Sequence, residues 1–118
     1  MHTIAFLFKR HPDMTLDEFH RHYKEVHGPI ARELPGLLEY RQYPLRAVGR
    51  GDVHARSDGG FDALSVFSWE SAEAAEAAWN SPQNGPVQED TQKMIDLDTM
   101  LTLPVTLRTV LSALEPAR

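Results

Sequence analysis

The chain has 118 residues, no cysteine, and 17 acidic side chains against 12 of lysine and arginine, for a formal net charge of −5 at pH 7. This length predicts one domain, residues 1–118, and the absence of cysteine excludes disulfides, zinc knuckles and thiol nucleophiles. The acidic balance, without any basic stretch, argues against nucleic acid and anionic membranes as partners.

The N-terminal segment HTIAFLFK, residues 2–9, is rich in β-branched and aromatic residues and predicts a strand. Ile4, Phe6 and Phe8 fall on one face, and the residues between them are apolar too, so both faces of this strand need covering. The apolar stretch is too short for a signal peptide, and no other segment is long enough to cross a membrane. We therefore expect a soluble, cytoplasmic protein.

A helix is predicted to begin after Thr15. This residue offers an N-cap, and Glu18 stands at the third following position, which is the capping-box spacing. Gly28 precedes Pro29 and is steered away from helical dihedral angles, so the helix is expected to stop or kink there. Its apolar stripe recurs at helical intervals and consists of Leu16, Phe19, Tyr23, Val26 and Ile30.

Two further strands with a long loop between them are predicted next. Residues 37–45 and residues 61–69 both read as strands, and the first carries Leu38 and Tyr40 on one face. The intervening stretch 47–60 is rich in Gly, Asp and Arg without periodicity, which predicts a mobile surface loop. Such a loop could close over a bound ligand.

The C-terminal half predicts helices and a last strand. Residues 70–80 are rich in Ala and Glu and strongly helical, whereas residues 81–96 hold a Ser-Pro helix start, a Gly-Pro interruption and a further helical stretch. Residues 97–111 alternate well enough for a final strand, in which Pro104 requires an edge position, a bulge or a break.

The order β-α-β-β-α-β is that of a ferredoxin-like α+β fold, an antiparallel four-stranded sheet with its helices on one face. The other face of the sheet is then bare, although the first strand is apolar on both faces. A second copy of the same sheet is the simplest cover for a short chain. We therefore predict a homodimer in which two sheets pack face to face.

The segment FKRHPDMTLDEFHRHYKEVHGPIARELPGLLEYRQY, residues 8–43, resembles the opening of the EthD family of dimeric α+β barrel proteins. The shared features are a strand ending in Lys-Arg, a helix ending in Val-His-Gly-Pro, then Leu-Pro-Gly and a tyrosine. Residues 61–71 and 89–96 are similar to the family's third strand and acidic helix. The resemblance implies a dimeric α+β barrel, with relatives that include lactone isomerases, polyketide cyclases that need no metal or organic cofactor, and a protein associated with ether degradation.

His27 is the first candidate for catalysis. At about 100° per residue it lies roughly 60° from the centre of the apolar stripe, on the border between core and solvent. A border histidine at a helix break can be half-buried in a cleft, with a pKa near neutrality and one nitrogen free to exchange protons. The pattern alone favours a C-terminal cap, whereas the resemblance to the EthD helix end favours catalysis.

The other histidines carry less weight. His20 and His22 are two positions apart and point away from each other on a helix, so they cannot clamp one metal ion. Solvated surface histidines explain both more simply, although His20 lies on the His27 side and could line the mouth of a pocket. His11 and His54, after the first strand and in the 47–60 loop, could reach over a pocket as lid residues.

Tyrosine, tryptophan and carboxylate side chains complete the candidate site. Tyr40 is the second catalytic candidate, because it could orient His27 or donate a hydrogen bond to a substrate oxygen. Asp90 and Asp96 flank the acidic helix, where a carboxylate could polarise His27 or act as a base; a cap or a solvated face is the alternative. Core packing is the alternative for the aromatic residues. The substrate-binding candidates are Tyr23, His20, Trp79, Asp96 and His11.

No Rossmann, Walker, His-Glu-x-x-His or nucleophile-elbow motif occurs in the sequence. The leading hypothesis is acid–base catalysis of the isomerase, cyclase or dehydratase type without metal or organic cofactor. The substrate is a small apolar molecule, and the resemblance suggests a lactone or polyketide. His27 would transfer the proton and Tyr40 would hold an oxygen. The alternatives are a non-catalytic accessory or small-molecule-binding protein of an oxidative pathway, and a cofactor-free or haem-binding monooxygenase.

Overall fold

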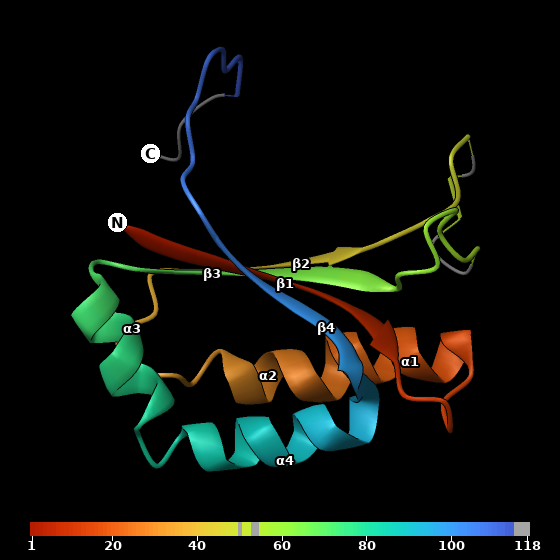
Figure 1. The fold of residues 1–118 in the computed structure, drawn as a ribbon, viewed down its shortest axis with the longest axis horizontal. Coiled ribbons are helices and arrows are strands. Elements are labelled where there is room, and N and C mark those ends of the chain that lie inside the picture. The colour runs from red at the N-terminus through yellow and green to blue at the C-terminus, as the bar shows by residue number, and fades with distance from the viewer. Residues whose placement is uncertain (50, 53–54, 115–118) are drawn as a thin grey trace.

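The computed structural model describes residues 1–49, 51–52 and 55–114 (Figure 1). His54, one of the lid candidates, lies outside these residues. No helix within the described ranges has the length and apolar character needed to cross a membrane. The elements in chain order are β1 (His2–Arg10), α1 (Leu16–His22), a π-helical turn η1 (Tyr23–His27), α2 (Gly28–Ala31), β2 (Glu39–Pro44), β3 (Ala63–Trp69), α3 (Ala72–Trp79), α4 (Asn84–Met94) and β4 (Ile95–Val105).

The four strands form one antiparallel sheet in the order β2-β3-β1-β4. All the helices lie on one side of this sheet (Figure 1). The predicted ferredoxin-like α+β fold is therefore confirmed. Pro104 pairs with Ile4 on the edge strand β4, which is one of the positions that a strand proline can occupy. This strand ends at Val105, earlier than the sequence pattern predicts.

The first helix does not stop at Gly28, which was one of the two outcomes that the sequence left open, the other being a kink. Gly28 has helical dihedral angles of φ −54° and ψ −54°, and its N–H donates to the carbonyl of Tyr23, five residues earlier. Pro29 stands in the first turn of α2, where a missing N–H is tolerated. The wide π turn before it absorbs the conflict between the proline ring and the preceding turn, so the chain stays helical from Leu16 to Ala31.

The π turn also changes which side chains face the core. In a regular α-helix Val26 would belong to the apolar stripe and His27 would lie at its border. The wider turn rotates the helix, so that Val26 is 41% exposed and His27 is only 5% exposed. The predicted stripe is therefore wrong at Val26, and Tyr23 and His27 share the buried face.

The core between sheet and helices consists of two clusters, both of which contact Phe6. One cluster centres on Phe67 and Trp69 of β3 and includes alanines of α3. The other centres on Phe8 and Tyr23 and includes residues from α1 and from the junction of α4 and β4. The sheet is thus held against the helices at both ends, and the space between the two clusters is where a cavity forms.

The opposite face of the sheet carries a row of apolar side chains on β1 and β4 and is not covered by any helix of the described residues. Leu101, Leu103 and Val105 of β4 are 46%, 40% and 43% exposed. The strand register places Leu101 opposite Leu7 and Leu103 opposite Ala5. We call these five residues the open face. Residues 106–114 and the described residues of the connection between β2 and β3 project on this same side, away from the helices (Figure 1).

The connection between β2 and β3 contains the predicted 47–60 loop, and its described residues form no helix or strand. Gly49 and Gly60 have φ angles of +79° and +78°, a conformation that favours glycine. At the end of the loop, the buried Asp62 accepts a hydrogen bond of 2.7 Å from the backbone N–H of Arg10 and lies 3.2 Å from its guanidinium. This contact fastens the loop to the end of β1.

Candidate functional site

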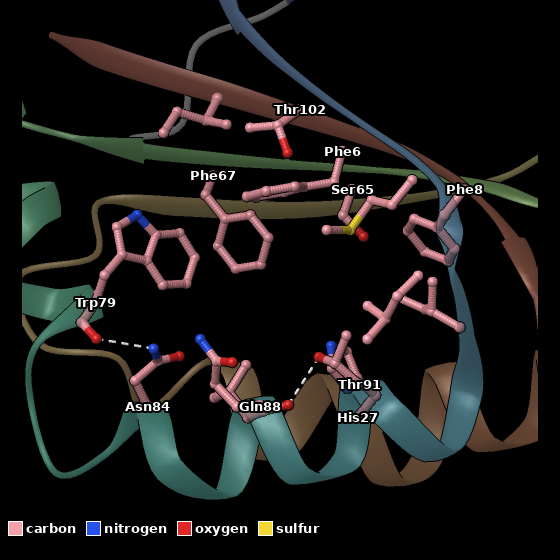
Figure 2. A pocket seen from close by; sticks show the side chains of 15 residues that line it. Phe6, Phe8, His27, Ser65, Phe67, Trp79, Asn84, Gln88, Thr91 and Thr102 are labelled. Atoms are coloured by element: carbon pink, nitrogen blue, oxygen red, sulfur yellow. Dashed lines mark hydrogen bonds between the residues drawn. The ribbon is translucent and has the colours of Figure 1, made fainter.

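A cavity of about 300 Å³ lies between α4 and the helix-covered face of the sheet. Figure 2 shows the 15 side chains that line it, none of which belongs to the 47–60 loop. The apolar lining residues are Ile4, Phe6, Phe8, Phe67, Trp79, Val87, Ile95, Leu97 and Met100, and the polar ones are His27, Ser65, Asn84, Gln88, Thr91 and Thr102.

Three aromatic rings form the wall at one end of the cavity. Phe6 packs edge-on against Phe67 and Trp79 at centroid distances of 5.7 and 5.9 Å, and Phe67 and Trp79 are 5.8 Å apart. Edge-to-face packing of this kind fixes the orientation of each ring. The structure therefore places Trp79, a binding candidate from the sequence, in a rigid apolar wall that suits a flat ligand.

His27 reaches the cavity from η1. Its Nδ1 atom lies 2.7 Å from Oδ2 of Asp90 on α4, and both side chains are buried. Because Asp90 occupies Nδ1, Nε2 is the ring nitrogen that remains for a ligand. Figure 2 shows the ring beside Thr91, on the α4 side of the cavity. The imidazole is thus oriented by one contact and open to chemistry at the other.

The Asp90 carboxylate also contacts a second histidine. Its Oδ1 atom lies 2.7 Å from Nε2 of His22, whose side chain is 21% exposed. A continuous hydrogen-bonded chain therefore runs from a partly exposed imidazole through a buried carboxylate to the cavity. Among the described residues, no group of three or more histidine, aspartate and glutamate side chains could hold a metal ion.

The environment of His27 favours its neutral form. Burial lowers the pKa of His27, the hydrogen bond and charge of Asp90 raise it, and the nearby His22 lowers it. Burial has the largest effect, so the pKa lies below its ordinary value and the neutral imidazole is favoured. The Nδ1–H group then donates to Asp90, which leaves a lone pair on Nε2. A general base needs this arrangement.

Tyr23 lies behind the cavity and does not line it. Its hydroxyl group is 2.6 Å from the Ser65 hydroxyl and 3.2 Å from the carbonyl oxygen of Leu64. Burial raises the pKa of Tyr23 well above its ordinary value. Tyr23 is therefore a neutral core residue. It contacts the hydroxyl of Ser65, and Ser65 lines the cavity.

Tyr40 does not reach the cavity that contains His27. Its ring stacks on Phe67 at a centroid distance of 4.4 Å, and its hydroxyl accepts a hydrogen bond of 2.8 Å from Nε2 of Gln42. Burial raises the pKa of Tyr40 to about 12. Tyr40 therefore does not line the cavity with His27, the other catalytic candidate from the sequence. Its ring packs on Phe67, which does line the cavity, and its hydroxyl interacts with Ser65 and with the charge of Asp90.

Three other candidates from the sequence also lie outside the cavity lining. His20 is buried against the ring of Phe19 at 5.3 Å, so the expectation of a solvated surface histidine is wrong. His11 accepts a hydrogen bond from the backbone N–H of Asp13. Asp96 accepts one from the backbone N–H of Asp98 at the start of β4, and Asp90 is the carboxylate that contacts His27.

Sequence reasoning did not single out the polar residues that α4 contributes to the cavity. Asn84, Gln88 and Thr91 all line it, together with the apolar Val87. Their positions follow the i, i+3, i+4, i+7 spacing of one helix face. That spacing was a signal for the cavity face of α4. Amide and hydroxyl side chains on a helix usually face solvent, so the pattern did not predict a cavity.

A family model described as EthD domain matches residues 11–98 of the chain. Comparison with curated proteins gives no match. The family match spans the segment from the end of β1 to the start of β4, so it includes His22, His27 and Asp90.

Solved structures share the fold at low sequence identity. An EthD family protein from Bacillus halodurans has a TM-score of 0.67 and 18% identity, over 92% of this chain and 100% of its own. A dimeric ferredoxin-like protein from Thermobifida fusca has a TM-score of 0.66 and 13% identity, over 90% of each chain. SnoaB, a cofactor-independent oxygenase from Streptomyces nogalater, has a TM-score of 0.60 and 19% identity, over 93% of this chain and 95% of its own.

Proposed function

The chain belongs to the EthD domain family, and from this premise we propose that it catalyses cofactor-independent proton transfer on a small, mostly apolar organic molecule. The reaction is an isomerisation, cyclisation or dehydration in which a carbon acid adjacent to a carbonyl group is deprotonated. The observation that carries the proposal is the placement of His27, whose Nδ1 is held by Asp90 while the ring lines an apolar cavity.

His27 is the general base in this reaction. Its Nε2 lone pair takes the proton as the C–H bond breaks, and the electron pair moves onto the carbonyl oxygen to give an enolate. The resulting imidazolium is stabilised by the Asp90 carboxylate at 2.7 Å. The same Nε2–H returns its proton to a different atom of the enolate, which completes an isomerisation without net consumption of a proton.

Hydroxyl groups on the cavity wall are the donors for the enolate oxygen. Thr91 donates its hydroxyl hydrogen to the carbonyl oxygen of Val87 at 2.7 Å, so it is not available as a donor. Thr102 of β4 extends into the cavity from the sheet side, with its hydroxyl turned toward the interior (Figure 2). Thr102 therefore takes the oxygen-holding role that the sequence reading gave to Tyr40.

Deuterium exchange into a simple probe tests this function without knowledge of the natural substrate. 2-Tetralone is a small two-ring ketone with acidic C–H groups next to its carbonyl. In D2O the protein should speed the loss of the signals of these C–H groups from the proton NMR spectrum. His27→Ala should lower the protein-catalysed rate by about 10²- to 10⁴-fold. Binding of 2-tetralone without exchange would contradict catalysis and favour the accessory, ligand-binding role.

Cofactor-free oxygenation is a second candidate function, and the similarity to an oxygenase described as cofactor-independent favours it. The first step is the same deprotonation by His27, after which the carbanion would react with molecular oxygen instead of being reprotonated. Oxygen consumption measured with an electrode in the presence of a readily oxidised hydroxyarene separates the two candidates. An absorption spectrum of the purified protein tests for haem.

We also propose that the protein acts as a homodimer. The open face exposes a row of apolar side chains that a second copy of the sheet would cover. Several structures that share the fold are described as dimeric and ferredoxin-like. The cavity lies on the helix side of the sheet, so each protomer keeps its own complete cavity in such a dimer.

A further inference from the structure

Asn84, the first residue of α4, is buried in the cavity lining with only part of its side chain paired. It is 5% exposed, and its Nδ2 group donates a hydrogen bond of 2.8 Å to the carbonyl oxygen of Trp79. A carbonyl oxygen only accepts hydrogen bonds, so this contact fixes which end of the amide faces Trp79. The Oδ1 atom must point the other way.

The Oδ1 atom of Asn84 is buried and has no hydrogen-bond partner within the described part of the chain. A buried amide oxygen that lacks a donor costs free energy, and such groups in folded proteins are nearly always satisfied. Figure 2 shows this oxygen turned away from Trp79 and toward Gln88, at the Trp79 end of the cavity. The Gln88 side chain beside it is exposed and can move aside.

We propose that Asn84 is the specificity residue of the cavity and that its Oδ1 accepts a hydrogen bond from a hydroxyl group of the ligand. The ligand is a flat, fused-ring molecule with a hydroxyl at one end and its acidic C–H group at the other. This assignment deepens the proposed function, because it uses the same cavity and names the class of molecule that fits.

The spacing along α4 sets the length of that ligand. Asn84 and Asp90 are six residues apart, which corresponds to about 9 Å along a helix axis. Asp90 holds His27, so the hydroxyl acceptor and the base lie toward opposite ends of the cavity. The aromatic wall of Phe6, Phe67 and Trp79 lies between sheet and helix along this path and covers an apolar skeleton of roughly two fused rings.

Binding of a matched pair of probes tests the assignment. 2-Naphthol has a hydroxyl donor, whereas 2-methoxynaphthalene has the same skeleton but can only accept. Isothermal titration calorimetry should show that the wild-type protein binds 2-naphthol about 5- to 100-fold more tightly than 2-methoxynaphthalene. This ratio corresponds to the free energy lost when a buried acceptor stays unpaired. Asn84→Leu, which is close in size but has no oxygen, should reduce this preference to about twofold or less.

Two control variants and a second measurement complete the experiment. Gln88→Leu removes the neighbouring amide and His27→Ala removes another acceptor in the lining, the Nε2 lone pair, and both should keep the preference. If Asn84→Leu does not fold, NMR of the wild-type side-chain amides applies: 2-naphthol should shift the Nδ2 signals of Asn84 by more than its methyl ether does, because only 2-naphthol adds a hydrogen bond to Oδ1.

The proposal is overturned if wild-type protein does not bind 2-naphthol or shows no preference for it. It is equally overturned if the preference survives Asn84→Leu, disappears in Gln88→Leu or His27→Ala, or if both probes shift the Asn84 signals alike. Because these are binding measurements, their failure is distinct from a failure of the 2-tetralone exchange, which tests proton transfer by His27.

Discussion

The Nδ1 atom of His27 lies 2.7 Å from the Oδ2 atom of Asp90, across 63 residues of chain. This contact selects the tautomer in which Nδ1 carries the hydrogen, so that the lone pair on Nε2 is available in the cavity. It also provides a counter-charge for the imidazolium that forms when Nε2 accepts a proton. The pairing therefore orients the buried imidazole in the way that the proposed general base requires.

Replacing the carboxylate should impair the base without removing it. Asp90→Asn can present its amide hydrogen to Nδ1 and thereby place the ring hydrogen on Nε2, and it cannot stabilise the imidazolium. We expect the 2-tetralone exchange rate to fall by about 10- to 100-fold, less than on removal of His27 itself. Asp96→Asn is the matched control, because Asp96 does not line the cavity, and it should leave exchange unchanged. Equal loss in both variants would show a general effect on folding instead.

The pH dependence of exchange should report the pKa of His27. Burial lowers that pKa below the ordinary value of 6.5, and the active form is the neutral ring. The rate should therefore rise with pH and reach a plateau, with its midpoint below 6.5. His22→Asn should raise the midpoint, since the charge of His22 lowers the pKa of His27. A midpoint above 6.5 in the wild type would contradict the assignment of His27 as a desolvated base.

The same shift predicts that mild acid destabilises the fold. A histidine with a lower pKa in the folded state binds fewer protons there than in the unfolded chain, so the free energy of unfolding rises with pH in the window between the two pKa values. Stability should fall as pH drops below 6.5, the ordinary value. Urea unfolding just above and below that pH measures the slope, and His27→Gln should reduce it. An unchanged slope in His27→Gln would assign the acid sensitivity to other groups.

Tyr40→Phe should affect stability and leave catalysis intact. The hydroxyl of Tyr40 accepts a hydrogen bond from Gln42 but does not line the cavity with His27. Its loss should lower the free energy of unfolding by about 1 kcal/mol, the usual contribution of one hydrogen bond. The 2-tetralone exchange rate should stay within about threefold of the wild type, by contrast with the loss of about 10²-fold or more expected for a catalytic group. A loss of about 10²-fold or more would indicate that Tyr40 takes part in catalysis.

Charge on the open face should dissociate the proposed dimer. Light scattering of the wild type should give about twice the chain mass of 13.3 kDa. Leu103→Asp places a carboxylate in the proposed interface and should shift the mass toward that of one chain. Val26→Asp is the matched control, because Val26 is 41% and Leu103 40% exposed, and Val26 is on the helical side of the sheet. A wild-type monomer, or an unchanged mass for Leu103→Asp, would refute the interface.

Local signals in the sequence were sufficient for the fold. Alternating apolar residues gave the strands, and the capping box of Thr15 and Glu18 gave the start of the first helix, as the structure confirms. These signals depend on side chains within one turn or one strand of each other, so they need no knowledge of the rest of the chain. The order of the elements then left few topologies to consider.

The composition of the cavity depended on events that local patterns do not encode. The π turn rotates His27 into the core and Val26 out of it, because the chain relieves the conflict at Pro29 by widening a turn instead of ending the helix. A periodicity of 3.6 residues cannot anticipate this change of phase. The sequence thus identified His27 but not how deeply it is buried.

The partners of His27 were decided by tertiary structure alone. Asp90 and Asp96 are equally plausible in the sequence, since both flank an acidic helix, and only the packing of α4 against η1 brings Asp90 to Nδ1. Packing likewise stacks Tyr40 on Phe67, so that Phe67 lines the cavity and Tyr40 does not. Such contacts join residues that are far apart in the chain, and their geometry follows from how whole elements pack in three dimensions. The sequence determined the elements and the position of His27, and the packing of α4 determined the groups that surround it.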